Sequence, residues 1–141
     1  MYGWLLNSID REYAVIHVLK DSPRGSVRLI RHEALGKRLI LRRFQGSGEV
    51  YRQLMGYVCG NLPQIYETAE QDGEVLVLEE FIEGDTLGFL LEEALFSPRE
   101  TREIVLQLCR ALWVLHSMAA VHRDIKPENV ILRGRGAVLI D

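Results

Sequence analysis

The chain has 141 residues, of which 48% are apolar and 26% are charged, a balance typical of a globular domain rather than a disordered tail or a membrane protein. The formal net charge is −3, but residues 1–60 carry ten basic against five acidic residues, whereas residues 61–141 carry seven against fifteen. In the first half, the arginines lie in segments whose alternating pattern is typical of β-strands, and no aromatic residues are interleaved with them. We therefore expect no nucleic-acid binding.

Targeting and membrane-spanning patterns are not found in the sequence. Residues 1–10 lack a basic stretch followed by an apolar run, and the most apolar segment, 111–121, is short and contains two polar residues. The two cysteines, Cys59 and Cys109, are far apart and lack the neighbours that a zinc site needs. We expect a cytoplasmic protein with two buried, reduced thiols and no membrane segment.

Five β-strands are predicted in the first part of the chain. Runs rich in β-branched and apolar residues alternate with segments of Asp, Ser, Pro and Gly, which favour turns. The runs are 13–20, 26–32, 38–44, 65–70 and 74–81. The last two flank Asp72-Gly73, a strong hairpin signal. The pattern predicts an antiparallel meander.

Two helices are predicted from 3.6-residue periodicity. In the first, Ser47 is placed to cap a helix with apolar positions at Val50, Leu54, Tyr57 and Val58. The second begins at Ser97-Pro98-Arg99-Glu100, which combines an N-cap serine, a first-turn proline and a reciprocally capping glutamate. We expect this helix to run to about Ala119 with a buried apolar stripe. The stripe consists of Ile104, Leu108, Ala111, Leu112, Leu115 and Ala119.

The second helix is followed by the motif His-Arg-Asp-Ile-Lys-Pro-Glu-Asn at residues 122–129. The motif resembles the catalytic loop of protein kinases, in which His-Arg-Asp is followed by four residues and Asn. An apolar strand then ends at Asp141, where kinases have the Asp of Asp-Phe-Gly. The chain is therefore similar to eukaryotic-like, bacterial-type serine/threonine protein kinases, from the N-terminal lobe through the catalytic loop and truncated at that Asp.

This resemblance implies an α+β, protein-kinase-like fold. It comprises a five-stranded antiparallel N-lobe sheet with one αC-type helix, followed by the first helices and the catalytic-loop hairpin of an incomplete C-lobe. We expect an ATP-binding N-lobe at 1–80, a hinge at 81–85 and a partial C-lobe at 86–141.

The resemblance also assigns catalytic roles. Phosphoryl transfer depends mainly on positioning and on neutralising charge. Asp124 would be the catalytic base, and Lys126 would neutralise the transferring phosphate, as in serine/threonine kinases. Asn129 and Asp141 would hold Mg²⁺ through hard oxygen ligands, with Asp141 carried on a tight hairpin. Arg123 resembles the residue that binds a phosphorylated activation loop, which favours a protein substrate.

The segment that aligns with the phosphate-binding, Gly-rich loop of kinases differs from the family's pattern. Gly25 matches the Gly-rich loop, but Lys20 and Ser22 occupy its other two glycine positions, and Pro23 lacks an N–H. We expect a stiffer lid, with Arg24 as a hypothetical phosphate contact.

The family's phosphate-binding lysine is replaced by Arg42, and we expect Arg42 to pair with Glu49 from the helix. Ile40 replaces a small alanine over adenine. Its bulk should narrow the nucleotide slot and weaken ATP binding.

The resemblance places adenine between Leu19 and Val27 above and Ile131 below. Main-chain groups of Glu80 and Ile82 would bind its edge. Glu79 falls at the back of this pocket, where an acid needs a partner or water.

The predicted function is ATP- and Mg²⁺-dependent phosphorylation of Ser/Thr hydroxyls on proteins, with the fragment inactive alone. One alternative is a nucleotide-binding pseudokinase or scaffold, favoured by the altered Gly-rich loop and Arg42. Another is a small-molecule phosphotransferase, which Arg123 and Lys126 disfavour. Because the missing part of a kinase would leave the second helix uncovered, we also expect a homodimer through that helix face.

Overall fold

The computed structural model describes residues 2–122, 124–134 and 136–140, and it divides into two compact units. The first unit contains Met1–Tyr57 and Gln64–Phe81, and the second contains Val58–Pro63 and Ile82–Asp141. Residues 58–63 thus belong to the second unit although they connect two elements of the first. The boundaries predicted for an N-lobe, a hinge and a partial C-lobe stay predictions.

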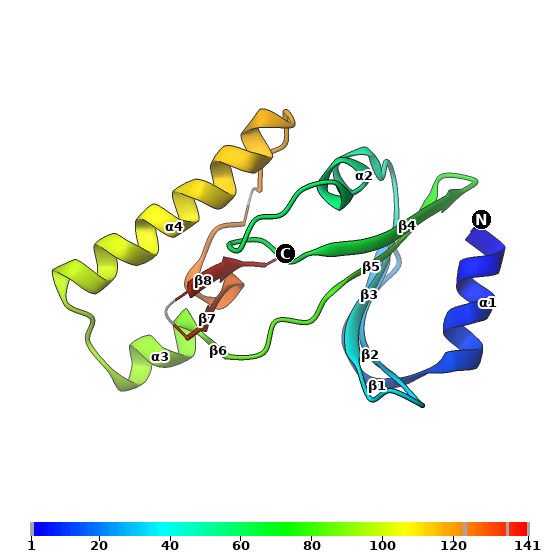
Figure 1. Cartoon of the computed structure of the whole chain (residues 1–141), viewed down its shortest axis with the longest axis horizontal. Coiled ribbons are helices and arrows are strands. Elements are labelled where there is room, and N and C mark those ends of the chain that lie inside the picture. Colours follow the sequence, from blue (N-terminus) through cyan, green and yellow to red (C-terminus); the bar gives the residue numbers. More distant parts are fainter. Residues whose placement is uncertain (1, 123, 135, 141) are drawn as a thin grey trace. The chain divides into compact units, whose positions relative to one another are not determined.

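The first unit is built on a five-stranded antiparallel sheet. Its elements are α1 (Tyr2–Glu12), β1 (Tyr13–Ser22), β2 (Gly25–His32), β3 (Arg38–Gln45), α2 (Glu49–Met55), β4 (Ile65–Gln71) and β5 (Glu74–Glu80). The strand order is β1-β2-β3-β5-β4 (Figure 1). At the β4–β5 turn, Asp72 and Gly73 both have positive φ angles, 52° and 78°, as the hairpin signal predicts. The predicted α+β class and antiparallel sheet are confirmed.

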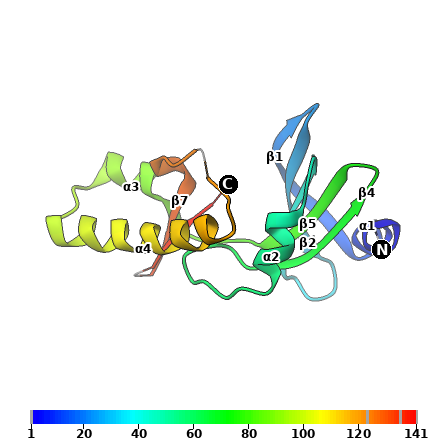
Figure 2. The same ribbon diagram turned by 90° about the horizontal axis from the view of Figure 1, so that it is seen from above.

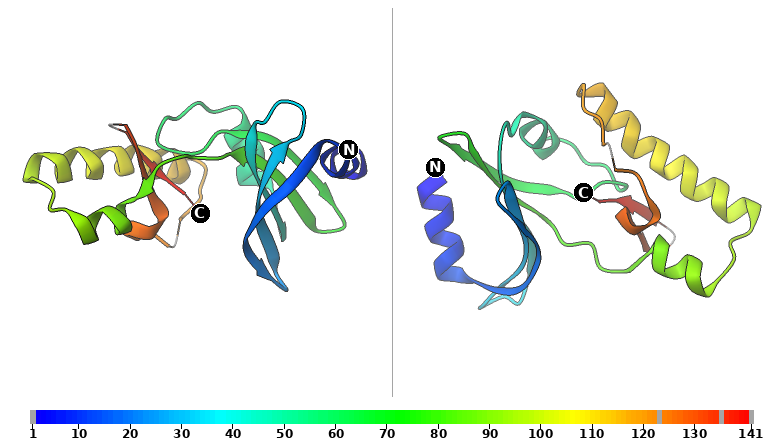
Figure 3. Two further views of the ribbon diagram at one scale, coloured as in Figure 1. Left: turned by 90° about the horizontal axis from the view of Figure 1, so that it is seen from below. Right: turned by 180° about the vertical axis from the view of Figure 1, so that it is seen from behind.

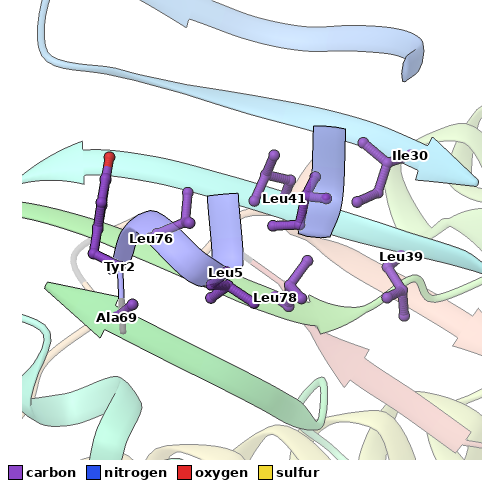
Figure 4. Close-up of a cluster of buried hydrophobic side chains, with 9 residues drawn as sticks. Tyr2, Leu5, Ile30, Leu39, Leu41, Ala69, Leu76 and Leu78 are labelled. Atoms are coloured by element: carbon purple, nitrogen blue, oxygen red, sulfur yellow. The ribbon is translucent and has the colours of Figure 1, made fainter. Parts of the chain in front are cut away.

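The N-terminal helix α1 packs against one face of this sheet. Tyr2, Leu5 and Ile9 are buried there, at helical spacing. They meet a row of sheet residues: Ile30, Leu39, Leu41, Ala69, Leu76 and Leu78 (Figure 4). This helix was not predicted from the sequence, because three apolar positions over 11 residues give a weak periodic signal.

Helix α2 covers the opposite face of the sheet. Its partly buried Tyr51, Leu54 and Met55 pack with Phe44 against the buried core. That core consists of Ile65, Val75 and Val77. Strand β5 is therefore buried on both faces.

Helix α2 is shorter than predicted. It ends at Met55, so Tyr57 and Val58 lie beyond it and are exposed. Its N-cap is Gly48 rather than Ser47; the Ser47 hydroxyl instead accepts a hydrogen bond from the Glu49 N–H at 3.3 Å. The prediction of the helix was correct, and the predictions of its cap and its end were wrong.

The second unit combines helices with a small sheet. Its elements are β6 (Asp85–Thr86), α3 (Leu87–Glu93), α4 (Pro98–Ser117), the 3₁₀ turn η1 (Pro127–Asn129), β7 (Val130–Arg133) and β8 (Gly136–Leu139) (Figure 2). The strand order is β6-β7-β8. The predicted capping box of α4 is present, since Ser97 Oγ accepts from the Glu100 N–H at 3.1 Å and Glu100 accepts from the Ser97 N–H at 2.9 Å.

Helix α4 lies along β8 (Figure 3). Its buried stripe is narrower than predicted. Ala111, Val114 and Leu115 are buried, whereas the helix ends at Ser117, before Ala119. Other apolar residues of α4 are exposed, namely Val105, Leu106 and Trp113. The homodimer expected through this helix stays a prediction.

The thiols differ from expectation. Cys59 is half-buried and Cys109 is exposed, so the prediction of two buried thiols was wrong. In the part of the chain that the structure describes, no helix combines the length and apolar character needed to cross a bilayer.

Removing the core contact of α1 should destabilise the first unit. The substitution Leu5→Ala should lower the free energy of unfolding by about 2–5 kcal/mol, because it leaves a cavity between α1 and the sheet. Urea unfolding followed by circular dichroism measures the change. Asn7→Ala, at an exposed position of the same helix, should change stability by less than about 0.5 kcal/mol. Equal effects of the two substitutions would contradict the packing of α1.

Candidate active site

The predicted catalytic loop connects α4 to the β7–β8 hairpin. Its last turn, η1, leads directly into β7. The Asn129 N–H donates to the Lys126 carbonyl oxygen at 2.9 Å, and the Ile140 N–H donates to the Asn129 carbonyl oxygen at 2.8 Å. The predicted tight hairpin is present, with Arg133 of β7 opposite Gly136 of β8. The end of the loop is therefore fixed to a paired strand.

His122 fixes the beginning of the same loop. Its Nε2 lies 2.9 Å from the Ile140 carbonyl oxygen, which can only accept, so Nε2 carries the proton. Its Nδ1 accepts a hydrogen bond from the Asp124 N–H at 3.2 Å. The neutral imidazole thus links the backbone of Asp124 to the segment that follows β8.

Asp124, Lys126 and Asn129 form one cluster. The Asn129 Nδ2 donates to the Asp124 carbonyl oxygen at 2.9 Å and to its Oδ2 at 3.1 Å. The Lys126 Nζ lies 3.4 Å from the same Oδ2. Asn129 is buried, while the side chains of Asp124 and Lys126 are 54% and 50% exposed. A buried amide therefore orients a carboxylate that is open to an incoming hydroxyl group.

The donor set of this cluster fits a hard metal ion. Both hydrogen bonds to Asp124 use Nδ2 of Asn129, so they leave its Oδ1 as an oxygen ligand. The other predicted ligand, Asp141, lies outside the described residues, as does Arg123. The structure thus brings together the three predicted catalytic residues. The role of the second metal ligand, Asp141, is predicted from the sequence alone.

Asn61 is a supporting residue that the sequence analysis missed. The side-chain Nδ2 of Asn61 donates to the Ala137 carbonyl oxygen at 2.9 Å and to Gln107 Oε1 at 3.1 Å. The main-chain carbonyl oxygen of Asn61 accepts a hydrogen bond from the Leu139 N–H at 2.9 Å. Gln107 Oε1 also accepts from the Ala137 N–H at 2.6 Å. This network fixes β8 against α4.

In the first unit, two of the predicted nucleotide-binding residues, Val27 and Arg42, share one face of the sheet. Directly opposite residues of antiparallel strands point to the same side, and one row of the sheet runs Lys20, Val27, Arg42 and Val77. Val77 packs with residues of α2, so this is the α2 face. Leu19 lies at an irregularity of β1 and is 48% exposed.

Gly25 is needed for packing in this sheet. A Cβ at this position would lie 2.3 Å from the Arg43 carbonyl oxygen, closer than any side chain can approach. Gly25 pairs with both Ser22 of β1 and Phe44 of β3. The glycine that matches the Gly-rich loop therefore allows β2 to approach β3, a reason independent of any phosphate.

Arg42 pairs with Glu79 rather than with Glu49. Its Nε and Nη2 both donate to Glu79 Oε1, at 2.8 and 2.5 Å. The two side chains are 15% and 8% exposed, whereas Glu49 is exposed on the first turn of α2. The predicted Arg42–Glu49 pair was therefore wrong, because Arg42 bonds instead to an acid on the adjacent strand β5. The same contact gives Glu79 the partner that its burial requires.

A second ion pair lies on the opposite face of the sheet. Arg43 follows Arg42 along β3 and so points toward α1, where its Nε donates to Glu74. The hydrogen bond from Arg43 lowers the pKa of the Glu74 carboxyl. Burial raises the pKa of the neighbouring Tyr2 hydroxyl. The two adjacent arginines thus have separate partners and separate roles.

The two residues predicted to bind the edge of adenine, Glu80 and Ile82, belong to different units. The Glu80 N–H donates to the Gln64 carbonyl oxygen at 2.8 Å, so this donor is used within the first unit. Ile82 belongs to the second unit, where it is buried in one cluster with Ile131 and Val138. The contacts of these residues with adenine stay predictions.

Comparison with known proteins defines the class. The family model for the protein kinase domain matches residues 48–141. The chain therefore belongs to the protein kinase family.

The matched relatives are serine/threonine kinases. The chain is 37% identical over 106 residues to serine/threonine-protein kinase PknA of Nostoc sp., covering 73% of this chain and 19% of that protein. It is 35% identical over 105 residues to serine/threonine-protein kinase D of Synechocystis sp., covering 73% and 20%. It is 34% identical over 102 residues to serine/threonine-protein kinase 36 of Pongo abelii, covering 72% and 8%. The chain thus spans about a fifth or less of the curated relatives it matches.

A solved structure shows the same fold. The crystal structure of Rad53 residues 1–466 in complex with AMP-PNP matches with a TM-score of 0.74 at 21% identity, covering 94% of this chain and 38% of that one. This match includes the first strands, which lie outside the range of the family model. The predicted kinase-like fold is confirmed.

Breaking the Arg42–Glu79 pair should destabilise the protein. The substitution Glu79→Gln should lower the free energy of unfolding by about 3–5 kcal/mol, because it removes the carboxylate that pairs with the largely buried guanidinium of Arg42. Glu49→Gln, at an exposed site, should change it by less than about 0.5 kcal/mol. The double variant Arg42→Met/Glu79→Leu should recover most of the loss, since an apolar pair can replace a buried ion pair. Denaturant unfolding measures all three, and a larger loss for Glu49→Gln than for Glu79→Gln would refute the pairing.

Proposed function

We propose that this chain forms the nucleotide-binding lobe and the catalytic loop of a kinase that transfers phosphate from ATP to Ser/Thr hydroxyls of proteins. The observation that carries the proposal is the cluster of Asp124, Lys126 and Asn129, in which a buried amide and a lysine hold one exposed carboxylate. The names of the matched relatives and the AMP-PNP bound to the Rad53 structure support the same activity.

Each residue of the cluster has a distinct role in the proposal. Asp124 accepts the proton of the substrate hydroxyl group as it attacks. Lys126, close to the same carboxylate, neutralises charge on the transferring phosphate. Asn129 orients Asp124 and offers Oδ1 to Mg²⁺, together with the carboxylate of Asp141. When bound, Mg²⁺ supplies positive charge to the phosphates.

The remaining parts of the proposal concern nucleotide, substrate and location. Leu19, Val27 and Ile131 would contact adenine, with main-chain groups of Glu80 and Ile82 at its edge. Arg123 favours a protein substrate over a small molecule. The two free thiols, Cys59 and Cys109, fit a reducing compartment such as the cytoplasm.

A pseudokinase or scaffold is the second candidate. It is favoured by the pairing of Arg42 with Glu79, which holds the replacement for the phosphate-binding lysine against strand β5. In this reading the chain binds nucleotide without transferring phosphate.

Calorimetric titration with Mg·ATP tests the binding half of the proposal. The unmodified chain should bind, and Asn129→Ala or Asp141→Asn should remove the dependence of binding on magnesium, because each removes an oxygen ligand. Asp124→Asn should bind Mg·ATP as the unmodified chain does, since the base is not needed for binding. Absence of magnesium-dependent binding by the unmodified chain would contradict the proposal.

Transfer of labelled phosphate tests the catalytic half and separates the two candidates. The complete gene product should phosphorylate Ser/Thr peptides, and Asp124→Asn should lower that rate by about 100-fold or more, because the general base is lost. Nucleotide binding without any transfer by the complete gene product would favour the scaffold.

A further inference from the structure

The N-cap residue of α2 takes its hydrogen-bond acceptor from another element. The buried Gly48 N–H donates to Oε1 of Glu70, on strand β4, at 3.0 Å. In a capping box, this N–H is accepted by a Glu or Gln side chain at N3, the third helical position. In α2 that position is Tyr51, whose ring packs on Phe44. Glu70 therefore supplies from the sheet what the N3 residue of a capping box supplies from the helix.

Two further contacts attach the start of α2 to the β4–β5 hairpin. Arg52, one helical turn after Gly48, donates to the same Oε1 of Glu70. The Gly46 N–H donates to the carbonyl oxygen of Gly73, in the β4–β5 turn, at 2.9 Å. Space for the carboxylate depends on Gly48, because a Cβ there would lie 2.6 Å from Glu70 Oε1. The start of the helix thus fits the side chain of Glu70.

The rest of α2 is held less firmly. All seven of its residues are described, and none of them is buried. A helix this short is marginal without tertiary contacts. Its partly buried Tyr51, Leu54 and Met55 contact the sheet, and Met55 Sδ accepts a weak hydrogen bond from the Thr68 hydroxyl at 3.6 Å. The contact with Glu70 therefore has a large share in fixing α2 on the sheet.

Tyr51 is the residue whose position depends most directly on this cap. The centroids of its ring and the Phe44 ring lie 5.6 Å apart. Both rings line a cavity together with Val27 and Arg42, two of the predicted nucleotide-binding residues. A shift of the first turn of α2 would therefore move one wall of this cavity.

We propose that Glu70 is a positioning residue, which caps α2 from strand β4 and thereby holds Tyr51 at the wall of this cavity. The effect on nucleotide binding rests on the proposed function, whereas the effect on α2 does not. The property that matters is the hydrogen-bond acceptor, since the pair with Arg52 is largely exposed and such pairs contribute little. Loss of the acceptor leaves the buried Gly48 N–H without a partner. Glutamine keeps a carbonyl oxygen and should replace Glu70.

Nuclear magnetic resonance tests the cap through hydrogen exchange of the Arg52 N–H, which donates to the Gly48 carbonyl oxygen at 2.9 Å. Glu70→Ala should speed this exchange by about tenfold or more, because the first turn opens more often. Glu70→Gln should stay within about threefold of the unmodified chain. Glu67→Ala, another acidic residue of β4, is the matched control and should also stay within about threefold. Unchanged exchange in Glu70→Ala, or equal effects of Ala and Gln, would overturn the inference.

Contacts between aromatic rings show whether the helix moves in a chain that is still folded. In Glu70→Ala, nuclear Overhauser effects between Tyr51 and Phe44 should weaken. Those between Tyr13 and His32, whose ring centroids lie 5.0 Å apart elsewhere in the first unit, should persist. Loss of both contacts together would mean that Glu70 only stabilises the whole unit, and would overturn the positioning role.

Calorimetric titration with Mg·ATP tests the consequence for the cavity. Glu70→Ala should bind about threefold to tenfold more weakly, because affinity falls with the fraction of molecules that have α2 in place. Glu70→Gln and Glu67→Ala should stay within about twofold, and circular dichroism verifies that each variant is folded. Unchanged affinity in a variant that has lost the Tyr51–Phe44 contact would overturn the positioning role. Absence of binding by the unmodified chain would contradict the proposed function, and the resonance measurements would still decide whether Glu70 caps α2.

Discussion

Strand β5 is buried on both faces, and much of the first unit depends on this constraint. Leu76 and Leu78 face α1, while Val75 and Val77 face α2. Glu79 continues the same strand, so it is withdrawn from water with its apolar neighbours. A buried carboxylate is costly without an opposite charge, and Arg42 on the adjacent strand supplies it. The position of Arg42 therefore follows from the burial of β5.

This pairing changes how the kinase architecture is assembled in this chain. In the family, a lysine of the third strand pairs with a glutamate of the helix, so the position of that helix controls the site. Here both members of the pair lie on neighbouring strands of one sheet, β3 and β5. The orientation of Arg42 is therefore set by strand register, which is rigid, and not by contact with Glu49 on α2.

The predicted catalytic loop depends on a buried amide. Asn129 donates to Asp124 and lies at the start of a hairpin whose other strand is held by Asn61 and Gln107. Buried polar groups that are hydrogen-bonded favour a single arrangement, because a shift would leave a buried donor unsatisfied. A flexible, exposed carboxylate thus becomes a positioned one.

The sequence by itself determined the strands, the hairpin at Asp72-Gly73, the capping box at Ser97 and the grouping of Asp124, Lys126 and Asn129. These features are local, since each depends on residue types and spacings within a few turns of chain. Only the tertiary structure decided that Tyr2, Leu5 and Ile9 form a helix on the sheet, that Arg42 pairs with Glu79, 37 positions away, and that Asn61 supports β8. Such contacts depend on which strands become neighbours and on which polar groups become buried. The spacing of residues along the sequence predicts neither property.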